Sequence, residues 1–404
     1  MFGRETKKII TDKDKINELL TRGVDKIYPS RELLEKLLLS GKKLRLYQGF
    51  DPTGDRLHLG HMVGLRKHKQ WQDLGHEVIF LIGDGTGQAG DPTGKKQTRE
   101  KFFTKEELRA NAKNYVAQAS KIIRFKGSNS VKILYNSDWL DKLTKVEILN
   151  IAQNFSVQQL IERDMFQERL KAGEPINLRE FLYPLLQGYD SVAMDVDLEL
   201  GGTDQTFNML AGRTLMKAMK GKEKFVMTTP LLSDSRGIKI GKSEGNTISL
   251  TDEPNDLFGK IMSLADDAII PIFTLLTDVS LEDIVSFDIK KNPLELKKSA
   301  AHIIVSQLYS EKLATKAQDN FEKTFTQGNV PENITQVTVA RDASLSDILL
   351  TQQLIVSKSE LRRLVSEGAI TNMATNEKVT DPNSKVSSAT YKIGKHRFIK
   401  IQTL

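Results

Sequence analysis

The chain has 404 residues, which is enough for two or three domains of ordinary size. Hydrophobic residues make up 39% and charged residues 27%, and no apolar stretch is long enough to cross a bilayer, so we expect a globular protein outside the membrane. The formal net charge is +7 and there is no cysteine, which excludes disulfides and thiolate metal sites; without a secretory leader, we expect a cytoplasmic protein.

The first part of the chain alternates strand-like and helix-like segments. Apolar runs and turn signals predict strands at 44–50, 77–83, 131–135, 198–202 and 225–229. A helical pattern occupies 59–74, and further helices lie between the other strands. This alternation predicts an α/β fold with a doubly wound parallel sheet. Residues 155–180 look helical and break the alternation, which indicates an insertion that packs against a second subunit.

After residue 250 the pattern becomes helical. Helices are predicted at 254–264, 269–277, 281–287 and 295–325. Residues 327–340 carry Gly328, Pro331 and polar side chains, which is typical of a linker.

The last part of the chain, 341–404, reads as a compact unit. Helices are predicted at 345–354 and 359–366, and strands at 369–371 and 398–401. The unit holds ten Lys or Arg and six Asp or Glu, a net charge of +4 (ten minus six). This charge fits an ordinary solvated surface. It also fits a surface that binds an anionic partner, and a nucleic acid is the partner that we expect in that case.

Two histidines flank a glycine in the motif His58-Leu59-Gly60-His61. A helix that begins there would carry both imidazoles on one face, and a helix N-terminus favours phosphate. Gly60 would let the backbone approach a ligand closely. A zinc pair and two surface histidines are the alternatives. Zinc needs further ligands, and the chain offers neither Cys nor a nearby His-Glu partner.

Glycine-rich segments follow two of the predicted strands. The run 83–96 would place backbone amides at the carboxyl edge of the sheet, where Asp91 would accept a hydrogen bond from an ammonium group. A surface loop with ordinary turn residues is the alternative. The segment 201–205 follows another strand in the same way.

A polar stripe is predicted on one helix. Tyr183, Gln187 and Asp190 are spaced i, i+4 and i+7, a spacing that normally marks an apolar core face. Three hydrogen-bonding side chains on an inward face indicate a lined pocket.

Two lysines recur three residues apart in Lys239-Ile240-Gly241-Lys242-Ser243. Gly, Ser and Asn around them suit a loop that closes over a transferring phosphate. A solvated charge run is the alternative.

Taken in order, these segments resemble the bacterial tyrosyl-tRNA synthetases, a family of class I aminoacyl-tRNA synthetases. Residues 46–54 with His58–His61 are similar to the family's first strand and HIGH motif, and 239–243 to its KMSKS loop. The C-terminal unit is similar to a small RNA-binding module shared with a ribosomal protein. The resemblance covers nearly the whole chain.

The resemblance implies a domain order. It gives a Rossmann-like catalytic domain at 1–250 with a helical dimerisation insertion near 155–180, an all-α anticodon-binding domain at 251–326, a linker at 327–340, and a small α+β RNA-binding domain at 341–404. It also implies a homodimer.

The resemblance assigns roles to individual residues. Tyrosine would be bound by Tyr47, Asp91, Tyr183, Gln187, Asp190 and Gln205. ATP would be bound by Gly49, Asp51, His58, His61, Gly202, Asp204, Lys239, Lys242 and Ser243. Catalysis would rest on Thr53, His58, His61, Lys239 and Lys242. Pyrophosphate or tRNA would meet Lys95, Arg99, Lys358, Arg362 and Arg363.

The implied chemistry has two steps. The carboxylate of L-tyrosine attacks the α-phosphorus of ATP, giving tyrosyl-adenylate and pyrophosphate, and the 3′-terminal adenosine of tRNA(Tyr) then takes the tyrosine. Mg²⁺ would come with the ATP, and no protein-ligated metal is expected. Catalysis would be positioning plus stabilisation of charge on the phosphates.

The sequence departs from the family pattern in three places. Residues 239–243 lie between the KMSKS form and a Gly-containing variant, Gln48 occupies a variable position, and Thr206 stands where many relatives carry tryptophan. None of these changes removes a charged group that the mechanism needs.

Three other functions would share some of these features. A tryptophanyl-tRNA synthetase would need a partner for an indole N–H, whereas Tyr47 and Asp190 suit a phenol. A phosphopantetheine-type nucleotidyltransferase also uses H-x-G-H, but it would not explain the polar stripe. A non-catalytic RNA-binding protein on a synthetase scaffold would not need intact motifs. The intact residues are His58, His61, Asp204, Lys239 and Lys242.

Overall fold

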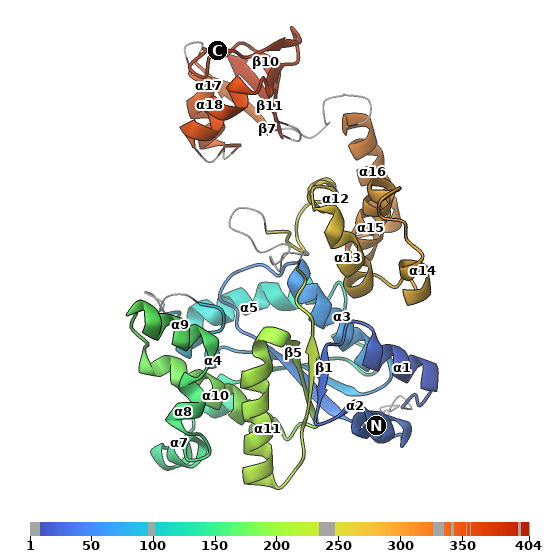
Figure 1. Cartoon of the computed structure of the whole chain (residues 1–404), viewed down its shortest axis with the longest axis vertical. Helices are drawn as coiled ribbons and strands as arrows, with labels where there is room; N and C mark the ends of the chain where they lie inside the picture. Colours follow the sequence, from blue (N-terminus) through green and yellow to red (C-terminus); the bar gives the residue numbers. More distant parts are fainter. Residues whose placement is uncertain are drawn as a thin grey trace. The chain divides into compact units, whose positions relative to one another are not determined.

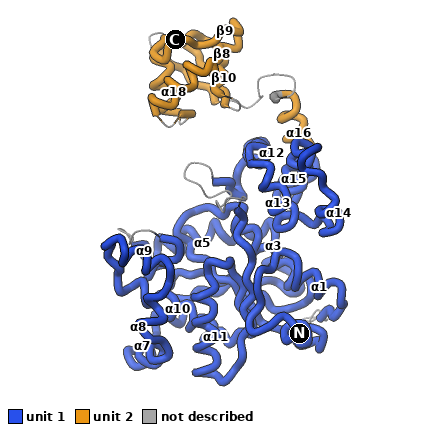
Figure 2. The backbone as a smooth tube through the Cα atoms, in the orientation of Figure 1, with its two compact units in different colours: residues 1–314 blue, residues 315–404 orange. Residues whose placement is uncertain are grey.

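The computed structural model describes residues 9–95, 102–233, 247–325, 335–340, 343–352, 354–355, 357–394 and 397–403. The chain forms two compact units, residues 1–314 and 315–404 (Figure 2). The larger unit holds a central sheet and most of the helices, and the smaller unit holds a second sheet.

A six-stranded sheet lies at the centre of the larger unit (Figure 1). Its strands are β1 (Lys26–Tyr28), β2 (Arg45–Phe50), β3 (Glu77–Ile82), β4 (Lys132–Tyr135), β5 (Leu198–Gly202) and β6 (Phe225–Thr229). The order is β1-β6-β5-β2-β3-β4, and all neighbours are parallel except β1 and β6. The predicted doubly wound sheet is confirmed. The three-residue β1 was missed, because so short a run shows no alternation.

The strand order reverses between β2 and β5. In open α/β sheets, ligands bind outside the carboxyl ends of the strands at such a switch point. Helix α3 (Leu59–Asp73) follows β2, and helices α10 (Leu178–Met194) and α11 (Thr206–Lys220) flank β5 in the chain. These elements therefore bring their first residues or polar faces to the switch point.

Helices α10 and α11 pack unusually closely. A Cβ added at Gly188 would lie 3.1 Å from backbone atoms of Ala211 and Gly212, so only glycine permits this approach without a shift. The close packing fixes the polar stripe of α10 against the sheet. The other helices around the sheet are α1 (Lys13–Thr21), α2 (Arg31–Leu39), α4 (Thr86–Ala89), α5 (Lys105–Ala119) and α6 (Ser137–Leu140).

The predicted insertion is helical. Residues 155–180 contain α8 (Val157–Ile161), α9 (Asp164–Ala172) and the first residues of α10, and α7 (Lys145–Ala152) precedes them. Large apolar side chains that are at least half exposed gather on these helices, namely Val146, Leu149, Val157, Leu170 and Leu178. The insertion therefore presents an apolar surface in a single chain.

A helical region follows the sheet in the chain. It contains α12 (Pro254–Met262), α13 (Ile269–Leu276), α14 (Leu281–Val285), α15 (Pro293–Leu308) and α16 (Glu311–Phe325). The prediction of one helix over 295–325 is wrong, because the backbone leaves the helical region at Tyr309 (φ −132°, ψ −85°). The Tyr309 hydroxyl donates to the carbonyl of Asp252 at 2.6 Å, and Lys121 Nζ lies 3.8 Å from the ring centroid. These tertiary contacts hold Tyr309 at the break.

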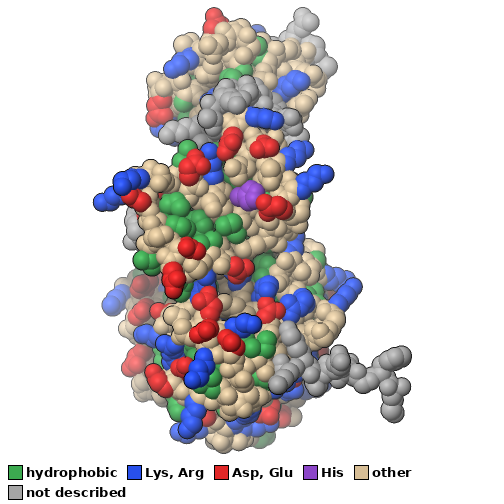
Figure 3. All heavy atoms as spheres, turned by 90° about the vertical axis from the view of Figure 1, so that its right-hand side faces the viewer, with side chains coloured by type: hydrophobic (Ala, Val, Ile, Leu, Met, Phe, Trp, Pro, Cys, Tyr) green, Lys and Arg blue, Asp and Glu red, His purple; other side chains and the backbone are tan. Residues whose placement is uncertain are grey.

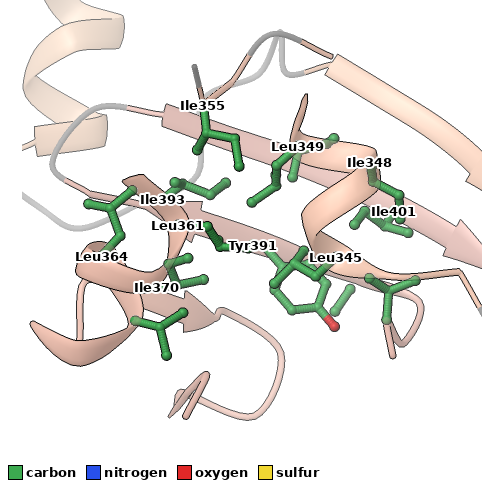
Figure 4. Close-up of a cluster of buried hydrophobic side chains, with 14 residues drawn as sticks. Leu345, Ile348, Leu349, Ile355, Leu361, Leu364, Ile370, Tyr391, Ile393 and Ile401 are labelled. Atoms are coloured by element: carbon green, nitrogen blue, oxygen red, sulfur yellow. The ribbon is translucent and has the colours of Figure 1, made fainter. Parts of the chain in front are cut away.

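The smaller unit is an α+β module. Its sheet has the order β7-β11-β10-β8-β9, with β7 (Thr335–Val339), β8 (Ile370–Asn372), β9 (Glu377–Lys378), β10 (Ala389–Ile393) and β11 (Arg397–Thr403). Helices α17 (Leu345–Thr351) and α18 (Lys358–Ser366) supply the other half of the core. Figure 4 shows Leu345, Leu349 and Leu361 meeting Tyr391 and Ile401 of the sheet.

The C-terminal sheet begins earlier than predicted. Residues 335–339, which the sequence placed in a linker, form β7 and pair parallel with β11. The strand was missed because it is largely polar, and only Val337 and Val339 pack against the core. On the face seen in Figure 3, positive and negative side chains are interspersed. Within the described ranges, no helix is long and apolar enough to span a membrane.

Candidate functional site

A pocket of about 580 Å³ opens at the carboxyl ends of the strands. Its volume falls within the range of small-molecule sites. The predicted site residues that line it are Tyr47, Gly49, Asp51, Thr53, His58, His61, Asp91, Lys95, Tyr183, Gln187, Asp190, Gly202, Asp204 and Gln205. Segments from β2 to η1 (Thr203–Gln205) therefore contribute to one cavity. Four predicted residues, Arg99, Lys239, Lys242 and Ser243, lie outside the described residues.

The two histidines form the start of α3. His58 is the N-cap, and its Nδ1 accepts from the backbone N–H of Gly60 at 3.1 Å. The Nδ1 atom of His61 accepts from the N–H of His58 at 3.1 Å, and the ring centroids lie 3.9 Å apart. A neutral imidazole that accepts at Nδ1 carries its proton at Nε2. Both rings therefore keep Nε2–H as a donor at a helix N-terminus, where anions bind.

The residues that follow the lysine motif 239–243 lie beside these histidines. The N–H of Leu59 donates to the carbonyl of Ile248 at 3.1 Å, and the N–H of Leu250 donates to the carbonyl of Leu57 at 2.9 Å. Residues 57–59 and 248–250 thus run side by side as an antiparallel bridge. Residues 248–250, which follow the lysine motif in the sequence, are therefore anchored beside the pocket.

Asp190 lies at the inner end of the pocket and is buried. Its two carboxylate oxygens accept from Asn136 Nδ2 at 3.1 Å and from Trp139 Nε1 at 2.8 Å. Burial raises the pKa of Asp190 well above its ordinary value, although these two donors act to lower it. The Tyr47 hydroxyl is also buried and lies 2.9 Å from Ser191 Oγ, and burial raises the pKa of Tyr47. Two buried polar groups thus line the same pocket.

Asp51 is held by two hydroxyl groups. The Tyr183 hydroxyl donates to Asp51 Oδ2 at 2.9 Å, and Thr86 Oγ1 donates to Asp51 Oδ1 at 2.7 Å. A Cβ at Gly83 would collide with Asp51 Oδ1, so glycine is required for this approach. Burial, and next the Asp51 charge, raise the pKa of Tyr183, which keeps its hydroxyl a donor.

Asp91 lies next to Gln205 at the glycine-rich edge. Gln205 Nε2 donates to Asp91 Oδ2 at 2.8 Å, and the backbone N–H of Thr93 donates to Asp91 Oδ1 at 2.9 Å. The segment is held from the insertion, since Arg163 Nη2 donates to Thr93 Oγ1 at 3.0 Å and Arg169 Nη2 donates to the Lys95 carbonyl at 3.1 Å. Arginines of the insertion thereby fix this edge of the pocket.

Gln187 is oriented by a carboxylate. Its Nε2 donates to Glu199 Oε1 at 2.9 Å. Its oxygen, Oε1, is buried and accepts no hydrogen bond from the described part of the chain. An unsatisfied buried acceptor is costly, so a donor is expected from a bound ligand.

Sequence reasoning missed the groups that hold the predicted residues in place. These are Thr86, Asn136, Trp139, Glu199 and Lys224. Two signals could have revealed some of them. A glutamate stands inside an otherwise apolar buried strand, and Asn136 directly follows β4 at the carboxyl edge of the sheet.

The C-terminal cations lie in the smaller unit. Lys358, Arg362 and Arg363 are exposed on α18. Lys358 Nζ lies 3.2 Å from Asp347, and Arg363 Nη1 lies 3.1 Å from Glu367. Exposed pairs of this kind are weak and leave the side chains available to an anion.

The chain is similar to known proteins along most of its length. A family model described as class I tRNA synthetases for tryptophan and tyrosine matches residues 39–326. A tyrosine–tRNA ligase of Carboxydothermus hydrogenoformans is 42% identical over 403 residues, covering 95% of this chain and 97% of that protein. One of Mannheimia succiniciproducens is 41% identical over 389 residues, covering 95% and 97%.

Solved structures share the fold. A tyrosyl-tRNA synthetase of Archaeoglobus fulgidus, solved in complex with L-tyrosine, has a TM-score of 0.60 and 22% identity, covering 76% of this chain and 100% of that chain. A C-terminally truncated mitochondrial tyrosyl-tRNA synthetase of Coccidioides posadasii has a TM-score of 0.62 and 24% identity, covering 76% and 91%. At such identities the likeness bears on the fold alone.

Proposed function

The chain belongs to the tyrosine–tRNA ligase family of class I tRNA synthetases, and from this premise we propose that its pocket activates L-tyrosine with ATP and transfers it to tRNA(Tyr). One observation carries the proposal. The polar stripe of α10 and the histidine N-terminus of α3 line a single cavity, so an amino-acid site adjoins an anion site.

The inner end of the pocket binds the phenol of tyrosine. Asp190 accepts from the phenol hydroxyl, and Tyr47 lies beside it. Phenylalanine would leave these buried polar groups without a partner, which costs about 1–3 kcal/mol per group. The pocket therefore favours tyrosine over phenylalanine.

The amino group of tyrosine binds at the middle of the pocket. Asp91 supplies a carboxylate, Tyr183 a hydroxyl, and Gln187 its amide oxygen Oε1, the acceptor that lacks a partner within the described residues. Gln205, next to Asp91, lies near the tyrosine carboxylate. These contacts leave one carboxylate oxygen of the substrate directed toward the nucleotide.

ATP binds as its Mg²⁺ complex at the histidine end. The Nε2–H groups of His58 and His61 donate to phosphate oxygens, and Thr53 lies near the same phosphates. Asp204 and Gly202 hold the ribose, while Gly49 and Asp51 complete the nucleotide site. Lys239, Lys242 and Ser243 complete the phosphate site.

The chemistry proceeds by two substitutions. A tyrosine carboxylate oxygen attacks the α-phosphorus and forms the new P–O bond as pyrophosphate leaves. A ribose hydroxyl of the terminal adenosine of tRNA(Tyr) then attacks the tyrosyl carbonyl and forms the ester bond. The bond from the carbonyl to the phosphate breaks, and AMP leaves with the hydroxyl proton. The histidines and lysines stabilise the charge that develops on the departing phosphates.

Other parts of the chain serve the tRNA and the assembly. Residues 251–326 bind the anticodon arm, and the C-terminal unit binds RNA through Lys358, Arg362 and Arg363. Lys95 and Arg99 contact pyrophosphate or the acceptor end. The apolar surface of the insertion forms a homodimer interface, and the protein acts in the cytoplasm.

Charging of tRNA(Tyr) with labelled tyrosine tests the whole proposal. We expect acid-precipitable tyrosyl-tRNA that depends on both ATP and the enzyme. Charging of tRNA(Trp) with tryptophan instead would replace the proposal with the related specificity. No charging of either tRNA would refute it.

A further inference from the structure

A buried ion pair adjoins the pocket, and the proposed mechanism does not use it. Lys224, directly before β6, is completely buried, and Glu199 on β5 is 1% exposed. Lys224 Nζ contacts Glu199 Oε2, and it donates to Ser191 Oγ at 2.8 Å and to the carbonyl of Met209 at 3.1 Å. The three ammonium protons therefore each have an acceptor. Buried charges persist only when they are paired in this way.

The neighbouring helix leaves space for the ammonium group. A Cβ at Gly212 on α11 would collide with Lys224 Nζ and would lie 2.7 Å from Ser191 Oγ. Glycine is less stable than alanine in the middle of a helix. The helix thus carries a locally unfavourable residue at the point where the ammonium group approaches.

The ion pair reaches the pocket through Glu199. This residue lines the cavity, and its Oε1 accepts from Gln187 Nε2 at 2.9 Å. A carboxylate has only acceptors, so it can hold the NH₂ end of the Gln187 amide but not the oxygen end. Because the amide is planar, its oxygen is then directed away from Glu199. That oxygen accepts no hydrogen bond within the described residues.

We propose that Lys224 and Glu199 are positioning residues that fix the Gln187 amide with its oxygen toward the substrate's amino group. Lys224 Nζ contacts one oxygen of the Glu199 carboxylate, and the other oxygen, which can only accept, selects the amide orientation of Gln187. The proposal rests on the proposed function, in which Gln187 contacts the α-ammonium group of tyrosine. It extends the tyrosine site to Glu199, which lines the pocket, and to Lys224, which is buried behind Glu199.

Glu199→Gln tests the orientation without a change in size. The Lys224 ammonium requires an acceptor, so the new amide turns its oxygen toward Lys224 and its NH₂ group toward Gln187. Gln187 must then turn its own NH₂ group into the pocket. We expect KM for tyrosine in pyrophosphate exchange to rise about tenfold or more, because an acceptor is replaced by a donor. KM for ATP should stay unchanged.

The double variant E199Q/K224M tests the cause. Without the ammonium group, the amide at position 199 can again turn its oxygen toward Gln187 and its NH₂ group toward Ser191 Oγ and the Met209 carbonyl. We expect KM for tyrosine to return to within about threefold of the wild-type value, a coupling that independent sites do not show. A rise in KM at least as large as in Glu199→Gln would overturn the proposal.

A tyrosine analogue without the amino group separates positioning from general damage. The probe is 3-(4-hydroxyphenyl)propionate, measured as a competitive inhibitor of tyrosine. Its inhibition constant should be the same for wild type and Glu199→Gln. An equal loss of affinity for tyrosine and for the analogue would show a distorted pocket and would refute the positioning role, as would no change in KM for tyrosine. Tyrosine-dependent pyrophosphate exchange by the wild type tests the proposed function itself, independently of the positioning role.

Discussion

Asp190→Asn should weaken tyrosine activation without affecting ATP. The asparagine side chain keeps the shape of Asp190 but has one oxygen in place of two. In the wild type, one carboxylate oxygen accepts from Asn136 at 3.1 Å and the other from Trp139 at 2.8 Å. The variant amide can serve only one of these donors, and its NH₂ group opposes the other.

The size of the effect follows from these contacts. A hydrogen bond to a charged group is worth about 1.5–3 kcal/mol, so losing the carboxylate acceptor for the phenol should lower kcat/KM for tyrosine about 10- to 150-fold. Burial raises the pKa of Asp190, so wild-type KM for tyrosine should rise as the pH falls toward that pKa. The variant should lack this dependence, because asparagine does not titrate.

The assay is tyrosine-dependent exchange of labelled pyrophosphate into ATP, with each substrate varied in turn. Asp197→Asn is a matched control, because Asp197 is also buried but does not line the pocket. It lies directly before the first residue of β5 and accepts from the backbone N–H of Arg45. The control should leave KM for tyrosine unchanged. If Asp190→Asn changed only KM for ATP, or neither KM, the phenol assignment would be refuted.

Three further predictions concern catalysis, stability and tRNA. His58→Ala should lower kcat of adenylate formation about 10²-fold with KM for tyrosine unchanged, measured by single-turnover kinetics, since it removes a donor to the phosphates; an unchanged kcat would contradict this role. Burial lowers the pKa of His68 to about 3, whereas an unfolded histidine titrates near 6.5, so the free energy of unfolding should fall as the pH falls from about 6.5 to 3. His68→Leu should flatten this pH dependence, measured by urea titrations at several pH values. An equally steep dependence in the variant would show that it arises from other groups. Deletion of 327–404, which removes β7 with the rest of its sheet, should weaken tRNA charging about tenfold or more while pyrophosphate exchange stays normal; equal loss of both would indicate a structural role.

The repeated elements of the fold could be predicted because local patterns determine them. Apolar runs predict β2 to β6, and the polar stripe on α10 predicts a pocket wall from the sequence alone. Residues 335–339 and the break at Tyr309 could not be predicted in this way. A polar strand becomes a strand only through its partner β11, and Tyr309 leaves the helix through contacts with Asp252 and Lys121.

The candidate site could likewise be predicted only in part from the sequence. Residues in motifs were found, whereas the groups that orient them were not, because they come from distant segments. Asn136, directly after β4, and Trp139, on α6, reach Asp190, and Lys224 reaches Glu199 from the residue directly before β6. The spacing of residues along the sequence does not reveal contacts between such distant segments.

The central claim is that this pocket activates tyrosine. Exchange of labelled pyrophosphate into ATP, measured with tyrosine, phenylalanine and tryptophan in parallel, tests it most directly. We predict exchange that depends on tyrosine, with phenylalanine and tryptophan close to the background. Exchange with tryptophan alone, or with none of the three, would contradict the account.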